Sequence, residues 1–162
     1  MTADTADESR QTLDGDVRIG WLVRALVGSL LLAGIAGAVG YAVDGVILFP
    51  AAVTFVVAAV LATGHTLARY RAWWYIVETD SLRLSRGVVT HVQTVVPYVR
   101  VQHVDVSRGP LERALGLSSV VVYTAGSRGA DVTIPGLSPD RADRLQQRLE
   151  RLAIAAEGED AV

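Results

Sequence analysis

A glycine-rich stretch with charged neighbours, near the middle of the chain, is the first place where this sequence could do chemistry. Residues 106–126 read VSRGPLERALGLSSVVVYTAG and combine three glycines, one proline and an Arg–Glu–Arg set. Glycine-rich loops can cradle phosphates when they follow a strand and open a helix in a recognised spacing. The candidate residues are Arg108, Gly109, Pro110, Glu112, Arg113 and Gly116. Because neither a Walker nor a GxGxxG pattern is present, we interpret the stretch as a structural turn and keep a ligand role as the alternative.

In this interpretation Gly109 and Pro110 break a strand and begin a short helical turn, since proline is tolerated at the first helical position. Gly116 then ends the turn before the next strand. Arg108, Glu112 and Arg113 hold the turn in place through ion pairs or by capping its backbone.

The residues that most often carry catalysis or bind metals are few and scattered. The chain has no cysteine, which excludes disulfides, thiolate metal sites and a cysteine nucleophile. Its three histidines, His65, His91 and His103, do not follow a metal-binding spacing such as HxxxH or HExxH. We therefore expect a protein that is not an enzyme, with no catalytic residues, no cofactor and no metal site.

Arginines form two further candidate sites. Arg69 and Arg71 follow a long apolar run, where they could pair with anionic lipid headgroups or simply fix the orientation of a membrane span. A second set recurs at helical spacing near the C-terminus and is a candidate partner surface: Arg141, Arg144, Arg148 and Arg151. The alternative for this set is a solvated helix face, supported by an Asp140–Arg144 pair.

The net charge of −2 hides a basic body between two acidic ends. Residues 1–16 carry five acidic residues and one arginine, and residues 157–162 carry three acidic residues. Such polar, acidic ends favour disorder. The body is too weakly basic, and too poor in aromatic residues on a basic strand face, to predict nucleic-acid binding.

Two uncharged runs of nineteen residues, 25–43 and 46–64, predict membrane spans. At 1.5 Å per residue each is about 29 Å long, close to the thickness of the bilayer core. Only Asp44 and Gly45 separate the runs, so we expect a helical hairpin.

Arginines flank the hairpin on the side of both chain ends, and only Asp44 lies in the linking turn. By the positive-inside rule we expect a multi-pass protein of the cell (inner) membrane with both termini in the cytoplasm. A cleaved signal peptide is the alternative for the first run, with Ala36-Gly37-Ala38 as the cleavage site.

From residue 73 onward the pattern changes to short strands and one helix. Runs such as 73–77, 82–90, 92–98, 99–107 and 119–125 are rich in valine and separated by turns, which predicts an antiparallel barrel or sandwich. The alternation over 99–107 is imperfect, so the pattern does not decide which face of this strand is buried. Ser138 and Pro139 then predict the start of an amphipathic helix whose apolar stripe is Ala142, Leu145, Leu149 and Leu152.

Three segments carry a family resemblance over roughly residues 16–153: RYRAWWYIVETDSLRLSRGVV, VVPYVRVQHVDVSRGPLERALGLSSVVVYTAG and IPGLSPDRADRLQQRL. The chain resembles the membrane-anchored bacterial pleckstrin-homology-like (PH-like) domain family of the YdbS type. The resemblance implies two spans before one PH-like domain, capped by a C-terminal amphipathic helix. It implies no catalytic residues, and it implies a partner membrane protein, since some members are encoded beside a larger relative.

The expected organisation has four parts: a disordered tail at 1–16, a transmembrane hairpin at 17–71, a cytoplasmic PH-like domain at 72–153 and a disordered tail at 154–162. We expect a non-catalytic, membrane-tethered module for protein interaction, scaffolding or regulation. Its expected partners are membrane lipids and either another membrane protein or a second copy of the chain. The alternative is a sensor of anionic lipid headgroups, although the acidic first hairpin turn, Glu78 to Ser81, argues against phosphoinositide-type binding. A membrane enzyme is the third and weakest hypothesis.

Overall fold

The computed structural model describes residues 10–126 and 131–160. The chain divides into two compact units. One is the helical segment Arg18–Arg71, and the other combines the N-terminal segment up to Val17 with Ala72 onward. Each unit is described by itself.

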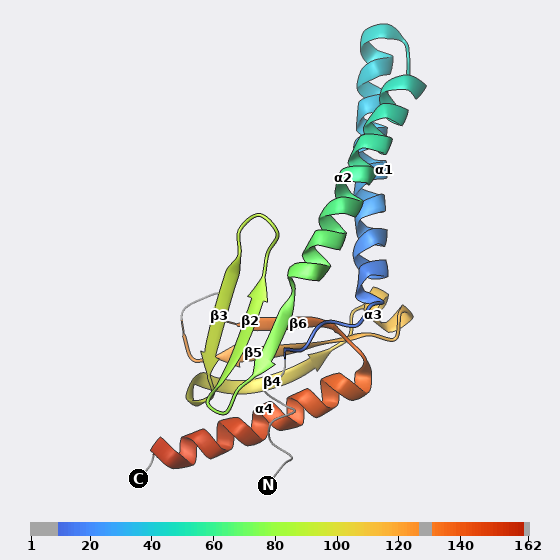
Figure 1. The fold of residues 1–162 in the computed structure, drawn as a ribbon. Helices are drawn as coiled ribbons and strands as arrows, with labels where there is room; N and C mark the ends of the chain where they lie inside the picture. Colours follow the sequence, from blue (N-terminus) through green and yellow to red (C-terminus); the bar gives the residue numbers. More distant parts are fainter. Residues whose placement is uncertain (1–9, 127–130, 161–162) are drawn as a thin grey trace. The chain divides into compact units, whose positions relative to one another are not determined.

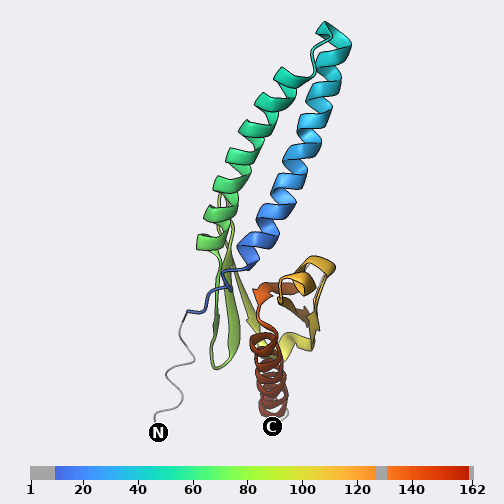
Figure 2. The same cartoon turned by 90° about the vertical axis from the view of Figure 1, so that its right-hand side faces the viewer.

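The helical unit is a hairpin of α1 (Val17–Asp44) and α2 (Leu48–Ala72), which lie side by side in Figures 1 and 2. Both helices are long and apolar enough to cross a membrane, with mean hydropathies of 2.0 and 1.8. They are longer than the runs 25–43 and 46–64, because arginine is a good helix former and the helices continue through their polar ends.

Small residues of α1 allow α2 to approach closely near the linking turn. A Cβ atom on Gly40 would lie 2.5 Å from both the Cγ of Pro50 and the carbonyl oxygen of Val46. Most large apolar side chains of the hairpin are exposed; Leu31 is 66% exposed and Leu48 is 82% exposed. Such a continuous apolar surface suits lipid rather than water.

The second unit contains two antiparallel sheets of three strands each. The first consists of β1 (Trp74–Val77), β2 (Ser81–Arg86) and β3 (Val92–Pro97), in that order. After the short 3-10 helix η1 (Tyr98–Arg100), the second consists of β4 (Val101–Ser107), β5 (Ser118–Thr124) and β6 (Val132–Leu137). The core is made of fully buried side chains from both sheets, including Tyr75, Leu82, Leu84, Val120, Val122 and Ile134.

A β-bulge explains the imperfect alternation in β4. The register with β5 shifts between Val101 and His103, so that Val101 and Val104 are both buried although they are three residues apart. An extra residue in one strand moves the following side chains to the opposite face.

The helix α4 (Pro139–Asp160) packs on the sheets through its apolar stripe, with contacts to β4, η1 and β5. Ala142, Leu145 and Leu149 are buried, and Ala153 completes the stripe in place of the half-buried Leu152. Two antiparallel sheets followed by this helix, after two long apolar helices, confirm the expected fold class.

Both expected tails differ from the structure. Residues 10–16 lie against the domain, because Leu13 is buried and Gln11 exchanges backbone hydrogen bonds of 2.8 and 2.9 Å with Tyr75. Residues 154–160 continue α4, in which Ala155, Ala156 and Glu157 are good helix formers. The rest of the two expected tails, 1–9 and 161–162, falls outside the described residues.

Candidate functional site

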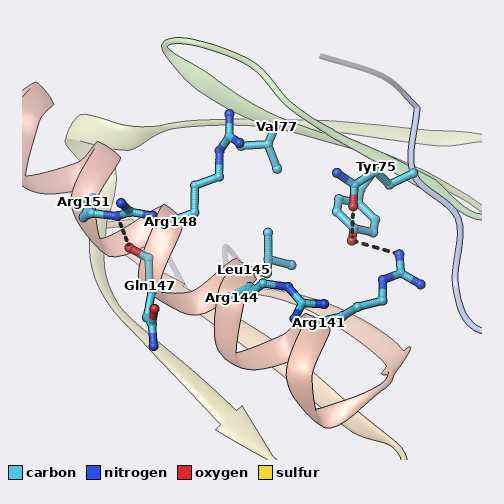
Figure 3. A pocket seen from close by; sticks show the side chains of 9 residues that line it. Tyr75, Val77, Arg141, Arg144, Leu145, Gln147, Arg148 and Arg151 are labelled. Carbon is cyan, nitrogen blue, oxygen red and sulfur yellow. Dashed lines mark hydrogen bonds between the residues drawn. The ribbon is translucent and has the colours of Figure 1, made fainter. Parts of the chain in front are cut away.

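A groove of about 470 Å³ runs between the edge strand β1 and the helix α4 (Figure 3). The residues that line it are Gln11, Tyr75, Val77, Arg141, Arg144, Leu145, Gln147, Arg148 and Arg151. All four arginines of the predicted partner surface therefore meet at one groove. We call it the arginine groove.

The sequence of α4 places these arginines there. They recur at spacings of three, four and three residues, which keeps them on one helix face. The neighbouring face carries Ala142, Leu145 and Leu149, which are buried against the sheets. Packing of the apolar stripe thus directs the arginine face toward β1.

Arg141 is held by contacts inside the domain. One guanidinium nitrogen lies 2.6 Å from an Asp14 carboxylate oxygen, and the other donates to the carbonyl oxygen of Thr12 at 3.0 Å. The second Asp14 carboxylate oxygen accepts the backbone N–H of Ser138 at 2.5 Å, just before α4 begins. Asp14 thereby fixes the N-terminal segment to the first turn of α4.

Tyr75 completes this end of the groove. Its hydroxyl donates to the side-chain oxygen of Gln11 at 2.8 Å and lies 3.5 Å from the Arg141 guanidinium. Burial raises the pKa of Tyr75, although the Arg141 charge acts in the opposite direction. Burial lowers the pKa of Arg141, but Tyr75 and Asp14 outweigh it, so that the pKa lies above its ordinary value. Tyr75 therefore remains a neutral donor beside a permanent cation.

The other three arginines line the rest of the groove. Arg144 and Arg151 are exposed, and Arg148 is half-buried and extends toward Val77 in Figure 3. The Arg151 side chain donates to the carbonyl oxygen of Gln147 at 3.2 Å. The ion pairs found among the described residues do not include the expected Asp140–Arg144 pair.

The β1 wall of the groove is buried at its backbone. Tyr75 directs its N–H and C=O toward Gln11, away from β2. Tyr75 and Val77 are each only 1% exposed, so the arginines of α4 supply most of the polar surface of the groove.

The stretch 106–126 forms a closed turn around Glu112. The short helix α3 (Pro110–Ala114) begins at the proline. One Glu112 carboxylate oxygen accepts the N–H of Gly109 at 2.8 Å, and the other accepts the Ser119 hydroxyl at 2.5 Å. Gly116 has a φ of +65° directly after α3. These contacts support the structural interpretation, because both oxygens of the one carboxylate in the turn are engaged.

The flanking arginines contribute less to this turn. Arg108 lies 4.0 Å from Asp143 of α4, and both side chains are about half exposed. Arg113 is exposed on α3. Leu117 is buried, whereas Leu111 and Leu115 are only half-buried.

The histidines do not gather into a catalytic or metal-binding cluster within residues 10–126 and 131–160. His91 is exposed beyond β2. His103 stacks on Tyr123 across β4 and β5 with ring centroids 4.2 Å apart. His65 lies on α2, in the other unit.

Comparison with known proteins decides the family. The model of a family described as "Bacterial PH domain" matches residues 18–153, which covers most of the chain. The chain belongs to the bacterial PH domain family. This confirms the resemblance drawn from the sequence.

A relative of this bacterial PH domain protein is the UPF0699 transmembrane protein YdbS of Bacillus subtilis (strain 168). The two are 38% identical over 85 residues, which is 52% of this chain and 52% of the relative. The chain thus matches about half the length of that relative. No solved structure matches the chain.

The acidic turn of this bacterial PH domain, between β1 and β2, is occupied by its own contacts. Glu78 lies 2.7 Å from Arg83, and the Ser81 hydroxyl lies within 3.1 Å of both Glu78 and Asp80. The Tyr98 hydroxyl lies 2.9 Å from the carbonyl oxygens of Glu78 and Ser81. Burial, with the charges of Asp80 and Glu78, raises the pKa of Tyr98. The acidic side chains of this turn are engaged in contacts that stabilise the fold, and their negative charge does not suit an anionic headgroup.

The two predicted headgroup arginines have different surroundings. The Arg69 guanidinium lies over the ring of Trp21, 4.2 Å from its centroid, between α2 and α1. Arg71 is exposed in the last turn of α2. Arg69 therefore contacts the other helix of the hairpin, whereas Arg71 is exposed at the end of its own helix.

The sequence did not single out Gln11 and Tyr75, which line the arginine groove, or Asp14, which holds Arg141 beside it. The acidic character of 1–16 suggested a tail, and Asp14 is 124 residues from Ser138. The local signal that could have corrected this is Leu13, an apolar residue that is only 3% exposed.

Proposed function

We propose that this bacterial PH domain protein is a non-catalytic module, tethered to the membrane by its hairpin, that binds an extended acidic segment of another membrane protein. The arginine groove carries the proposal. It places a row of four cationic side chains of α4 along one groove beside β1.

The arrangement of the arginines suits an extended ligand. They follow one another along α4, so an extended peptide lying in the groove can meet several of them. Carboxylates on that peptide can then receive charge-assisted hydrogen bonds from Arg144, Arg148 and Arg151. The arginine row therefore selects acidic sequences.

We further propose that the module works at the inner face of the cell membrane with both termini in the cytoplasm. Arg18 and Arg24 lie near the start of α1, and Arg69 and Arg71 lie near the end of α2, whereas Asp44 lies at the opposite end of the hairpin, as the last residue of α1. Cytoplasmic flanks of membrane spans are enriched in arginine. The hairpin then holds the PH domain close to partners in the same membrane.

A headgroup-sensing role for the PH domain has weaker support. The residues around the β1–β2 turn are acidic and engaged in internal contacts. The cationic side chains of the domain instead gather at the arginine groove. Four arginines spread from Arg141 to Arg151 along α4 suit an extended ligand better than a single headgroup.

Capture from native membranes tests the proposal. The full chain and an R144E/R148E variant are expressed at equal levels, solubilised in a mild detergent and purified, and the retained proteins are quantified by mass spectrometry. We expect one membrane protein with an acidic segment to be retained by the parent chain and reduced at least about tenfold with the variant. Each reversal replaces an attraction by a repulsion, and about 1.4 kcal/mol corresponds to tenfold in affinity.

An R86E/R100E variant is the matched control, because it makes the same charge change at arginines that do not line the groove. It should retain the partner. Equal loss in both variants would mean non-specific charge attraction and would contradict the proposal. The parent chain could instead retain a differently tagged second copy of itself, and the R144E/R148E variant could lose that copy while the control keeps it. That result would show that the partner is a second copy of the chain, in a homo-oligomer, rather than another protein.

A further inference from the structure

The helical hairpin contains a cavity of its own, of about 880 Å³, between α1 and α2. It lies toward the ends of the two helices that carry the arginines. Its α1 wall includes Trp21, Arg24 and Gly28, and its α2 wall includes Leu61, His65 and Arg69. None of these residues belongs to the arginine groove.

One end of the cavity is cationic. Arg24 of α1 and Arg69 of α2 both line this end. None of the ion pairs found among the described residues involves either arginine. The face of Trp21 supports the Arg69 guanidinium at 4.2 Å. Two guanidinium groups with no nearby carboxylate leave a place for an anion.

The other end of the cavity is apolar. Leu32 of α1 and Leu61 of α2 line it, with the small residues Ala58 and Ala62 between the helices. Leu32 is eight residues from Arg24 and Ala58 is eleven residues from Arg69, which at 1.5 Å per residue corresponds to about 12–16 Å. That distance is about half of the roughly 30 Å bilayer core, the depth of one leaflet.

Orientation of the spans does not by itself explain this arrangement. Arg18 and Arg71 serve orientation equally well by position, yet neither lines the cavity. Gly28 lies on the wall beside open space, since a Cβ atom built there meets no atom within 4 Å. Two positive charges at one end and an apolar wall at the other are complementary to a molecule with an anionic head and an apolar tail.

We propose that the hairpin cavity binds one anionic phospholipid, with its phosphate between Arg24 and Arg69 and one acyl chain along the apolar wall toward Leu32 and Ala58. Basic pockets between transmembrane helices on the cytoplasmic side are a known place for acidic lipid headgroups. The site lies in the hairpin rather than in the PH domain, so it is independent of the peptide-binding function proposed above.

The test reconstitutes the full chain in vesicles of equal phosphatidylglycerol and phosphatidylcholine, extracts it in a mild detergent and measures the retained lipids by native mass spectrometry. We expect at least a fivefold enrichment of phosphatidylglycerol in the parent chain. An R24Q/R69Q variant should reduce the enrichment to below twofold. The matched control R18Q/R71Q removes one interfacial arginine from each helix outside the cavity. It should keep the phosphatidylglycerol enrichment of the parent chain.

A steric pair of variants tests the acyl chain separately. G28L fills the cavity, whereas G34L adds the same side chain at a position that is equally open but does not line the cavity. G28L should lower phosphatidylglycerol retention at least fivefold, and G34L should leave it unchanged. Equal retention of the two lipids by the parent chain, equal loss in R18Q/R71Q, or unchanged retention in G28L would each overturn the proposal. Retention of a partner by the arginine groove is a separate readout, which these hairpin variants should not change.

Discussion

Asp14 connects parts of the domain that are far apart in the sequence. One of its carboxylate oxygens contacts Arg141 at 2.6 Å, and the other accepts the backbone N–H of Ser138. A carboxylate at the start of a helix also interacts favourably with the helix dipole. The residue therefore stabilises the start of α4 and fixes Arg141 at one end of the arginine groove.

We predict that D14N lowers the free energy of unfolding by about 1–3 kcal/mol, the range expected for losing a hydrogen bond to a charged group. The Arg141 ion pair adds little to this value, because both side chains are about 30% exposed. Urea unfolding of the detergent-solubilised chain measures the change. D16N removes an exposed carboxylate two residues away and is the control. A D14N value within 0.5 kcal/mol of the D16N value would show that Asp14 does not hold the helix start, since surface substitutions fall about in that range.

At the scale of elements, β6 depends on a glycine that is packed against the N-terminal segment. Gly136 has a φ of +64°, and a Cβ atom there would lie 2.4 Å from the side chain of Val17. Its carbonyl oxygen also accepts the N–H of Asp14 at 2.9 Å. The end of β6 is therefore stabilised by the N-terminal segment, and the segment is held in place by the end of β6.

Comparing G136A with G116A separates backbone strain from packing. Both glycines have φ near +65°, but nothing lies within 4 Å of a Cβ atom on Gly116. We expect G116A to cost about 1–2 kcal/mol, the price of a left-handed conformation. G136A should cost at least about 1 kcal/mol more, because overpacking adds to strain. Thermal unfolding of the two variants, followed by circular dichroism, checks this; equal costs would show that Val17 moves aside freely.

Local patterns predicted the elements because their signals lie within a few residues. Ser138 and Pro139 marked the start of α4, and its leucine spacing marked the buried face. The valine-rich runs marked the strands, although the bulge after Val101 hid the inner face of β4. No local pattern could pair Gln11 with Tyr75, because that contact joins residues 64 apart. The arginine stripe was therefore predictable, whereas the strand edge and Asp14 beside it were not.

At the scale of the whole molecule, the proposed topology places both chain ends on one side of the membrane and the α1–α2 turn on the other. The chain has no cysteine of its own, so single cysteines report on one position each. In intact cells, D44C should react with a membrane-impermeant maleimide. I154C, at a residue that is 70% exposed on α4, should react only after the cells are permeabilised. The reverse pattern would invert the topology, and labelling of both positions in intact cells would contradict a cytoplasmic domain.

The proposed ligand of the arginine groove is an extended acidic segment of another membrane protein. Site-specific photocrosslinking in living cells tests it most directly, with p-benzoyl-phenylalanine in place of Arg144 and, as a control, in place of Arg100 outside the groove. We expect a crosslink from position 144 to an acidic segment of one membrane protein, and none to that segment from position 100. Crosslinks from both positions to the same proteins, or from position 144 to lipid alone, would contradict it.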